Sequence, residues 1–404
     1  MGLHDSIERF AQEMGWVVKY ADDGTPNFFY PIYKCKSSDL DASLPEHTHP
    51  AFIVNGQEID RRLIAVFKGS SHNGACHSIP NMPPLVNTGA DQLLAKIKAC
   101  GTGFGPKTCA DSGLILLLAK KNGWVPKGNN AYGVDYRDGT SFELNKSVAV
   151  GDKRVFRGWE YTALVGHTTS AEHLPSEDVG YWKKGKHVGG TPVVSQYGAD
   201  NSYRGYNTLT GSGPASWRLD GTVSGIDDLN GNCFDQDYGY RIYDGELQVL
   251  ENNNAADPSA DLSASSAAWK AILPNSANNG HTLVAPGTSG TLHWTWANSK
   301  ITLDTVAPTF DNEYRGTSFK DLAVNSANIP YVPALLYELG LFPMPGDTTQ
   351  GYYYMQFAQG ERFPRRGGIC SFTSGAGLGC VYSNNPRSTA NVYYGVRGGF
   401  RSTS

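Results

Sequence analysis

The last part of the chain, residues 365–401, reads RRGGICSFTSGAGLGCVYSNNPRSTANVYYGVRGGFR. Two glycine pairs, at 367–368 and 398–399, enclose a stretch from Ser371 to Tyr394 whose single charged residue is Arg387. Tyr, Asn, Ser, Thr and Gly dominate this stretch. Antibody-type paratopes have the same composition, because aromatic rings supply contact area and small polar side chains supply adaptable hydrogen bonds. The stretch therefore predicts an exposed binding surface, and an ordinary glycine-rich β-hairpin is the alternative.

We expect ten side chains of this segment to lie exposed on one ligand-binding face. A folded domain leaves several aromatic rings together in water mainly where they contact a partner. The ten are Phe372, Ser374, Val381, Tyr382, Asn384, Asn385, Asn391, Tyr393, Tyr394 and Arg397. The residues expected to support the backbone beneath them are Gly368, Pro386, Gly399 and Phe400.

Upstream of this segment, start and stop signals mark two helices. In each of the stretches 88–101 and 108–123, a Thr followed three residues later by Asp provides a cap, and a glycine ends the apolar pattern. A short helix is also expected near 332–339. Residues 292–303 alternate in polarity around Asn298-Ser299 and predict a hairpin. Two early helices followed by many short strands indicate an α+β domain, not a parallel α/β one.

The chain is expected to have two parts. Residues 1–46 carry an amphipathic helix that ends at Gly15, with too few apolar side chains to fold alone. We expect this segment to attach or assemble the protein by burial against a partner or a sister chain, with a homotrimer as the first guess. Residues 47–404 should form one domain, with an elaboration at about 252–342 and the ligand-binding segment at 366–401.

Composition argues against several classes of partner. The net charge of -4 and the absence of a long Lys/Arg run give no reason to expect nucleic acid. The longest apolar run, 114–119, is far shorter than the ~20 residues that a bilayer-spanning helix needs, so no membrane span is expected. The first residues lack a basic region followed by an apolar stretch, so a secretory signal is not expected either. A virus particle released by lysis is one other route out of a cell.

Signatures of catalysis are mostly missing. There is no G-x-S-x-G and no H-E-x-x-H, and a phosphate loop ending at Lys107 is rejected because Pro106 removes a backbone donor. The histidines at 47, 49, 72 and 77 lack Cys or carboxylate neighbours at ligand spacing, which favours hydrogen-bonding or surface roles. Seven scattered cysteines without a C-x-x-C pair indicate buried reduced thiols, and a disulfide between Cys370 and Cys380 is the alternative.

An acidic stretch at 225–237 has oxygen-bearing side chains at alternate positions. Its candidate metal ligands are Asp228, Asn230, Asn232 and Asp235. Such side chains suit Ca²⁺, but the stretch fails as an EF-hand because Gly231 follows Asp228 too early and the required glutamate position is Gly239. Asn and Asp also stabilise tight turns by bonding their own backbone. A structural turn is therefore preferred, and a structural Ca²⁺ site stays open.

Together, these motifs resemble the C-type-lectin-fold variable proteins that retroelements diversify in phages and bacteria. In that family the variable region begins R-G-G, passes an A-G step and a P-[RS]-S stretch, and ends in G-F-R. Here these elements are Arg366-Gly367-Gly368, Ala376-Gly377, Pro386-Arg387-Ser388 and Gly399-Phe400-Arg401. Stretches that look like the family's scaffold are 49–52, 128–133, 209–214, 225–232, 245–249 and 341–343. The resemblance runs from about residue 47 to the C-terminus.

The resemblance implies a C-type lectin-like fold of the formylglycine-generating-enzyme type. In that arrangement a rigid scaffold holds the backbone of the C-terminal segment, while its side chains vary and bind a ligand. In phage relatives the ligand is generally a molecule on the host cell surface. The expected function is thus that of a non-enzymatic adhesin on a virion, at the phage tail beside other tail proteins, that binds a host cell-surface protein or glycan. An extracellular or bacterial cell-surface location is the other expectation.

Two alternatives stay open. One is a virion structural or decoration protein whose segment no longer varies. The other, which we expect least, is an enzyme of the formylglycine-generating type. Such enzymes have G-N-V-W-E-W where this chain has GNCFDQ at 231–236, and their active cysteines lie close together, unlike Cys370 and Cys380. No catalytic residue is therefore assigned.

Overall fold

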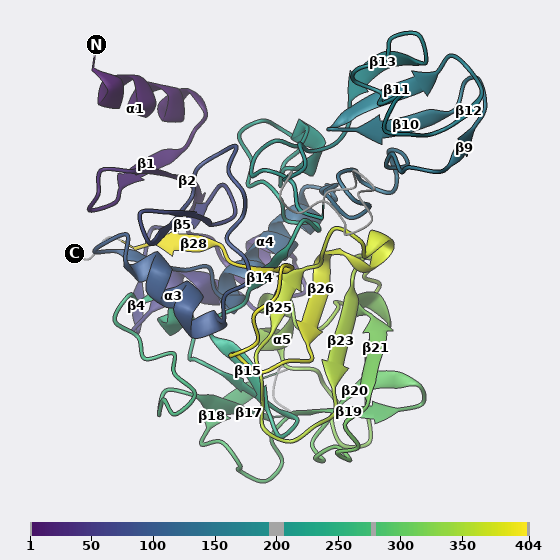
Figure 1. Ribbon diagram of the computed structural model, residues 1–404. Coiled ribbons are helices and arrows are strands. Elements are labelled where there is room, and N and C mark those ends of the chain that lie inside the picture. The colour runs from purple at the N-terminus through teal and green to yellow at the C-terminus, as the bar shows by residue number, and fades with distance from the viewer. Residues whose placement is uncertain (1, 194–205, 276–279, 402–404) are drawn as a thin grey trace.

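The computed structural model describes residues 2–193, 206–275 and 280–401 (Figure 1). Helices make up 15% and strands 31% of the chain, in mixed sheets, so the molecule has the α+β character that the sequence predicts. The main core lies around α4 (Cys109–Lys121), which contributes Leu114 and Leu117 to it. No helix within the described ranges is long and apolar enough to cross a bilayer.

A five-stranded antiparallel sheet joins the two ends of the chain. Its order is β1 (Val17–Tyr20), β2 (Pro26–Tyr33), β5 (Arg61–Ala65), β28 (Gly398–Phe400) and β8 (Phe104–Pro106). The boundary expected at residue 46 is therefore not a structural break, because β2 pairs with β5 and buries Phe28 and Phe29 within the same chain. The boundary was expected because the first helix has few apolar side chains, and the apolar side chains of β2 were not considered.

The helices follow their local signals in part. Thr108 caps α4, since its Oγ1 accepts from the Asp111 backbone N–H and the Asp111 carboxylate accepts from Thr108 N–H. In α3 (Ala90–Lys98) the cap residue is Gly89, and the Thr88 hydroxyl donates to the Val86 carbonyl instead. The remaining helices are α1 (Leu3–Glu13), α2 (Ser37–Leu40) and α5 (Ala334–Glu338).

A six-stranded sheet carries most of the C-terminal segment. Its order is β21 (Tyr314–Ser318), β23 (Tyr352–Gln356), β26 (Gly377–Ser383), β25 (Arg365–Gly367), β14 (Phe234–Gln236) and β27 (Tyr394–Gly395). In Figure 1, β25, β26, β23 and β21 stand side by side in yellow and green. The segment thus supplies three strands here and then crosses to the five-stranded sheet as β28.

A third, eight-stranded sheet is built mainly from the region after residue 240. Its members are β15 (Tyr240–Tyr243), β16 (Glu246–Val249), β17 (Lys270–Pro274), β18 (His281–Val284), β19 (His293–Ala297), β20 (Lys300–Asp304), β22 (Ala323–Val324) and β24 (Glu361–Arg362). Positive φ angles at Asn298 and Ser299 turn β19 into β20, which confirms the hairpin. Trp294 and Ile301 pack into the same core as Leu114, so 252–342 has no core of its own among the described residues.

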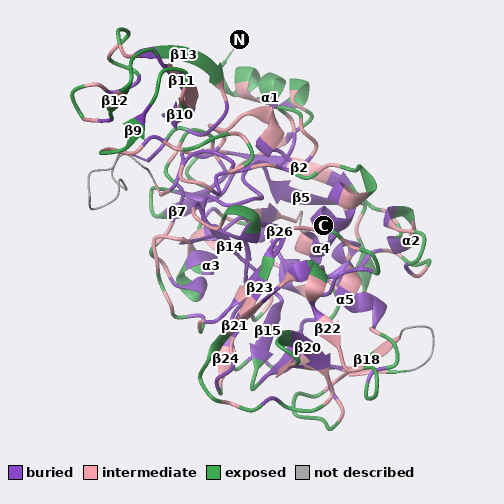
Figure 2. Ribbon diagram, turned by 90° about the vertical axis from the view of Figure 1, so that its right-hand side faces the viewer, coloured by how far each residue is buried: buried purple, intermediate pink, exposed green. Residues whose placement is uncertain are grey.

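A small lobe, which the sequence did not predict, has its own core. It contains β9 (Ser147–Val148), β10 (Lys153–Phe156), β11 (Trp159–Ala163), β12 (His167–Thr168) and β13 (Trp182–His187). Trp182, Tyr161 and Phe142 are buried there in a cluster separate from the main core. The lobe projects from the body at the upper right of Figure 1, and Figure 2 shows β13 as mostly exposed.

Two short strand pairs, β3 (Ile53–Val54) with β4 (Gln57–Glu58) and β6 (Ser70–His72) with β7 (Ala75–His77), complete the described strands.

Candidate functional site

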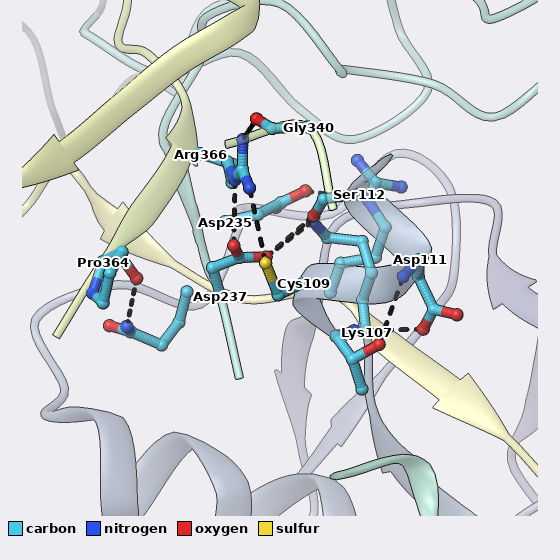
Figure 3. A network of polar contacts seen from close by, with 12 residues as sticks. Lys107, Cys109, Asp111, Ser112, Asp235, Asp237, Gly340, Pro364 and Arg366 are labelled. Carbon is cyan, nitrogen blue, oxygen red and sulfur yellow. Dashed lines mark hydrogen bonds and ion pairs between the residues drawn. The ribbon is translucent and has the colours of Figure 1, made fainter. Parts of the chain in front are cut away.

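A buried ion pair fixes the start of the C-terminal segment. Arg366 in β25 donates through Nε to Asp237, 2.9 Å away, and through its other nitrogens to the carbonyls of Gly340 and Leu339. Asp237 also accepts from the Ser112 hydroxyl of α4 (Figure 3). Burial alone would lower the pKa of Arg366, but Asp237 raises it above the usual value, so the guanidinium keeps its charge in the interior.

A second buried ion pair fixes the end of the segment. Arg397 donates to Asp235 at 3.0 Å and to the carbonyls of Ala65 and Val66. Lys68 donates to the other oxygen of Asp235 at 2.9 Å. Burial would raise the pKa of Asp235, but Arg397 and Lys68 outweigh it and hold that pKa well below the usual range. Both carboxylates belong to β14 or directly follow it, so one strand holds both ends of the segment.

A third arginine ties the middle of the segment to the body. Arg387 forms a two-pronged pair with Glu361, at 2.7 and 2.9 Å, and also bonds Asp91 at 2.7 Å. Its guanidinium lies over the ring of Phe363, 4.5 Å from the centroid. Bidentate pairs of this kind fix geometry as well as charge. The single charged residue of the stretch is thus an anchor, and not part of an exposed surface.

These contacts correct the expected binding face. Four of its ten residues are buried: Val381, Asn384, Tyr394 and Arg397. Arg397 has no exposed surface, because its guanidinium is used to anchor the chain. Val381 faces Tyr353 in the main core, whereas its neighbour Tyr382 faces outward, as strand alternation requires.

The supporting residues also need a correction. Gly368 and Gly399 are buried as expected, and a Cβ on Gly368 would lie 2.6 Å from Ala376 Cβ. Pro386 is exposed and lies outside the strands, and Phe400 is only partly buried against Phe104.

The other six expected residues reach the surface. Ser374 is exposed, and the five partly exposed ones are Phe372, Tyr382, Asn385, Asn391 and Tyr393. Phe372, Tyr382 and Tyr393 pack on one small cluster with Phe234 and Tyr394 at its centre. The rings of the segment therefore rest on a buried aromatic base and stay partly exposed.

Aromatic side chains outside the segment continue this surface on two sides. On the strand side, the ring centroid of Tyr354 in β23 lies 5.1 Å from that of Tyr382. The ring centroid of Tyr314 in β21 lies 6.3 Å from that of Tyr354. On the other side, Tyr206 lies 5.7 Å from Tyr393 and 6.1 Å from Tyr132. Sequence reasoning missed these tyrosines. Neighbouring side chains of a strand point to opposite faces of the sheet, so the run Tyr352-Tyr353-Tyr354 could have predicted rings on both faces. We call the whole set the aromatic face.

The aromatic face is uncharged. Burial raises the pKa of both Tyr382 and Tyr393 to about 12, so their phenols stay neutral at physiological pH. Arg365 is fully buried beneath the face, with its guanidinium 3.9 Å from the centroid of Tyr394, and burial lowers its pKa to about 10. The charge is covered by the ring, so the described side chains of the aromatic face and the segment beside it offer phenol, amide and hydroxyl groups.

The candidate calcium stretch is a hydrogen-bonded turn. The Asn230 amide donates to the Pro126 carbonyl and its oxygen accepts from Asn130, while Asn232 donates to the Thr208 carbonyl. Asp235 is used by Arg397 and Lys68. Within the described ranges no three His, Cys, Asp or Glu side chains are placed to hold a metal. These contacts favour the structural turn over a shared metal site.

Asp228 differs from the rest of that stretch. Its Oδ1 is buried without a hydrogen-bond partner, and burial together with Asp227 raises the pKa of Asp228 to about 8. Burial thus favours the neutral form of this carboxyl group, and a structural Ca²⁺ site stays a prediction.

Cys380 and one cavity are the remaining features near the segment. Cys380 is a free buried thiol whose pKa burial raises to about 12, so the alternative disulfide is not formed and this sulfur is not a nucleophile at neutral pH. A cavity of about 760 Å³ between the end of α4 and residues 344–350 meets the segment only at Gly377 and Leu378.

No protein-family model and no curated protein matches this chain. Its function is therefore inferred from the geometry of the aromatic face and its anchors.

Proposed function

We propose that the chain is a non-enzymatic binding protein that presents residues 371–394 as a variable ligand-binding surface on a C-type lectin-like scaffold. The proposed setting is a phage tail, where the surface would bind a protein or glycan on the host cell. The single observation that carries the proposal is the contrast within one segment. Three buried arginines hold its backbone, and between them Tyr, Phe, Asn and Ser side chains reach the surface.

This contrast is what a diversified binding site needs. Exposed side chains can change at little cost in stability, whereas the anchors carry the fold. The aromatic face also supplies large rings held on a rigid base, which reduces the entropy lost on binding. An enzyme of the formylglycine-generating type is less well supported, since Cys380 is held as a neutral thiol. A decoration protein would share the anchors but would not need variable positions.

Sequencing the coding region in many individual particles or cells of the source population tests the proposal. Substitutions should concentrate at the codons of Phe372, Ser374, Tyr382, Asn385, Asn391 and Tyr393. The codons of the anchors Arg366, Arg387, Arg397, Asp235 and Asp237 should remain unchanged. Variation spread evenly between the two sets, or no variation within the segment, would contradict a diversified binding surface and favour the decoration protein.

A further inference from the structure

Four exposed aliphatic side chains lie at the outer end of the small lobe. β10 and β13 run towards the body and β11 runs away from it, so the start of β10, the end of β11 and the start of β13 share one end. The other end adjoins the body, where the Gly190 N–H donates to the Gly133 carbonyl (Figure 1). The four exposed side chains, which we call the aliphatic tip, are Val150, Leu164, Val165 and Val179.

Backbone hydrogen bonds hold the loops of the aliphatic tip together. The Gly151 N–H donates to the Ala163 carbonyl and the Leu164 N–H donates to the Tyr181 carbonyl, both at 2.8 Å. Val150 and Val179, which stand close to these bonds in sequence, are 69% and 85% exposed. Single exposed apolar residues are ordinary on a protein surface, but several at one projecting end indicate contact with an apolar partner.

Exposed lysines follow the aliphatic tip along β13. They are Lys183, Lys184 and Lys186, and within the described part of the chain none of them forms an ion pair. The exposed carboxylate of Glu172 offsets one of these three charges. The other carboxylates around the tip pair with different basic side chains: Asp152 with Arg154, Glu160 with Lys153, Glu177 with Arg157 and Asp178 with His173.

The strand geometry places these lysines directly behind the aliphatic tip. Trp182, the first residue of β13, pairs with Ala163, and Leu164 of the tip follows Ala163. At about 3.3 Å per residue, Lys183 and Lys184 stand roughly 3 and 7 Å behind Trp182 along the strand. The polar layer on each side of a bilayer is roughly 5–8 Å thick. A tip that enters the edge of the acyl region would therefore leave both lysines among the headgroups.

The residue types favour a lipid surface over a protein as the partner. Protein interfaces are enriched in aromatic and arginine anchors and depleted in lysine, whereas this surface combines valine and leucine with lysine. Aliphatic side chains that enter the acyl boundary, with basic side chains beside them, are what holds proteins on anionic membranes.

We infer that the outer end of the lobe docks on a lipid surface that carries anionic headgroups. The aliphatic tip enters the boundary of the acyl chains, and the lysines of β13 contact the headgroups. This contact goes beyond the proposed function, because the lobe lies outside the segment that we propose to vary. It gives the protein a second attachment to a cell, which does not depend on the sequence of the segment.

Flotation of the full chain with lipid vesicles tests the inference. The chain should bind an equimolar mixture of phosphatidylcholine and phosphatidylglycerol at least about tenfold more tightly than phosphatidylcholine alone, and salt should weaken this binding. Leu164→Ser combined with Val179→Ser should weaken binding to the mixed vesicles by about tenfold. Lys183→Gln combined with Lys186→Gln should do the same.

Two matched pairs on the body serve as controls. Val223→Ser with Val306→Ser replaces two valines that are 59% and 58% exposed, and Lys121→Gln with Lys300→Gln replaces two exposed lysines. Each control pair should change vesicle binding less than about twofold. Thermal unfolding of all four double variants separates loss of the surface from loss of the fold.

Three results would overturn the inference. They are no binding to either kind of vesicle, equal binding to both kinds, and undiminished binding by the lobe variants. If the lobe variants lose binding to bacterial cells while the intact chain binds no vesicle, the surface docks on a protein and the lipid inference is wrong. None of these results bears on codon variation in the segment, so the proposed function is tested separately.

Discussion

At the scale of single residues, three arginines hold the backbone of the segment. Arg366, Arg387 and Arg397 carry charge into the protein interior, where each meets a carboxylate. Arg397 was expected among the exposed ligand-binding residues, but it is buried and anchors the chain. Its carboxylate partner, Asp235, lies 162 residues upstream, and the sequence around either residue does not indicate that the two form a pair. Distance in sequence is thus the reason why the anchors were missed.

Replacing Arg397 by methionine should destabilise the fold strongly. The change leaves Asp235 with Lys68 alone in a buried site, and breaking a buried pair in this way costs about 3–5 kcal/mol. The control is Arg401→Met, since Arg401 pairs with Asp257 nearer the surface and should cost at most about 1 kcal/mol. Urea unfolding of both variants measures the difference. Equal losses would show that Arg397 is not an anchor.

His49 should make the protein sensitive to mild acid. Its Nδ1 accepts from the Ala51 N–H and its Nε2 donates to the Glu338 carbonyl, so only the neutral ring satisfies both bonds. Burial lowers the pKa of His49 to about 4. A lowered histidine pKa means that the unfolded chain binds more protons between pH 6.5 and 4. The contribution of the neutral ring is therefore present above pH 6.5 and is lost as the pH falls towards 4.

The variant His49→Asn tests this acid sensitivity, because asparagine can still cap the turn at Pro50–Phe52 but does not titrate. Between pH 7 and 4.5 the intact protein should lose about 2–3 kcal/mol more stability than the variant. His47 acts in the opposite sense, since its hydrogen bond with Glu338 raises its pKa, and it is present in both proteins. Parallel stability curves for the two proteins would contradict the role of His49.

At the scale of elements, local signals predicted some structure correctly. The cap at Thr108, the turn at Asn298-Ser299 and the short helix near α5 all follow from neighbouring residues. The sheet order does not, because β14 pairs with strands more than 100 residues away. Composition indicated that the segment reaches the surface, and six of the ten expected residues do so, five of them only in part. Composition could not show that the other four are buried, because it does not say which contacts each side chain makes.

The lobe should behave as a separate cooperative unit. Its buried Trp182 packs against Phe142 and donates its indole N–H to the His173 carbonyl, away from the main core. Trp182→Ala should cost the lobe about 3–5 kcal/mol, enough to open it. Hydrogen exchange should then become fast in β10, β11 and β13 and stay slow in β14, β25 and β26. Faster exchange across both groups would mean that the lobe and the body unfold together.

At the scale of the whole molecule, the C-terminal segment contributes strands to two of the sheets. It leaves the eight-stranded sheet after β24, contributes β25, β26 and β27 to the six-stranded sheet, and ends as β28 between β5 and β8. The N-terminal strands β1 and β2 belong to that last sheet, so both ends of the chain depend on the segment (Figure 1). Both ends of the segment are thus held in sheets, and between them lie the side chains that we propose to vary. An assembly role for the first residues stays a prediction.

The central claim is that this backbone is fixed by its anchors and its surface side chains are free to change. The most direct measurement is the protease resistance of every single substitution at residues 366–401 in a displayed library. Most substitutions at Ser374, Tyr382, Asn391 and Tyr393 should leave the protein as resistant as the parent. Substitutions at Arg366, Arg387 and Arg397 should abolish resistance. If the surface positions tolerate change no better than the three arginines, the segment is ordinary core and the account is wrong.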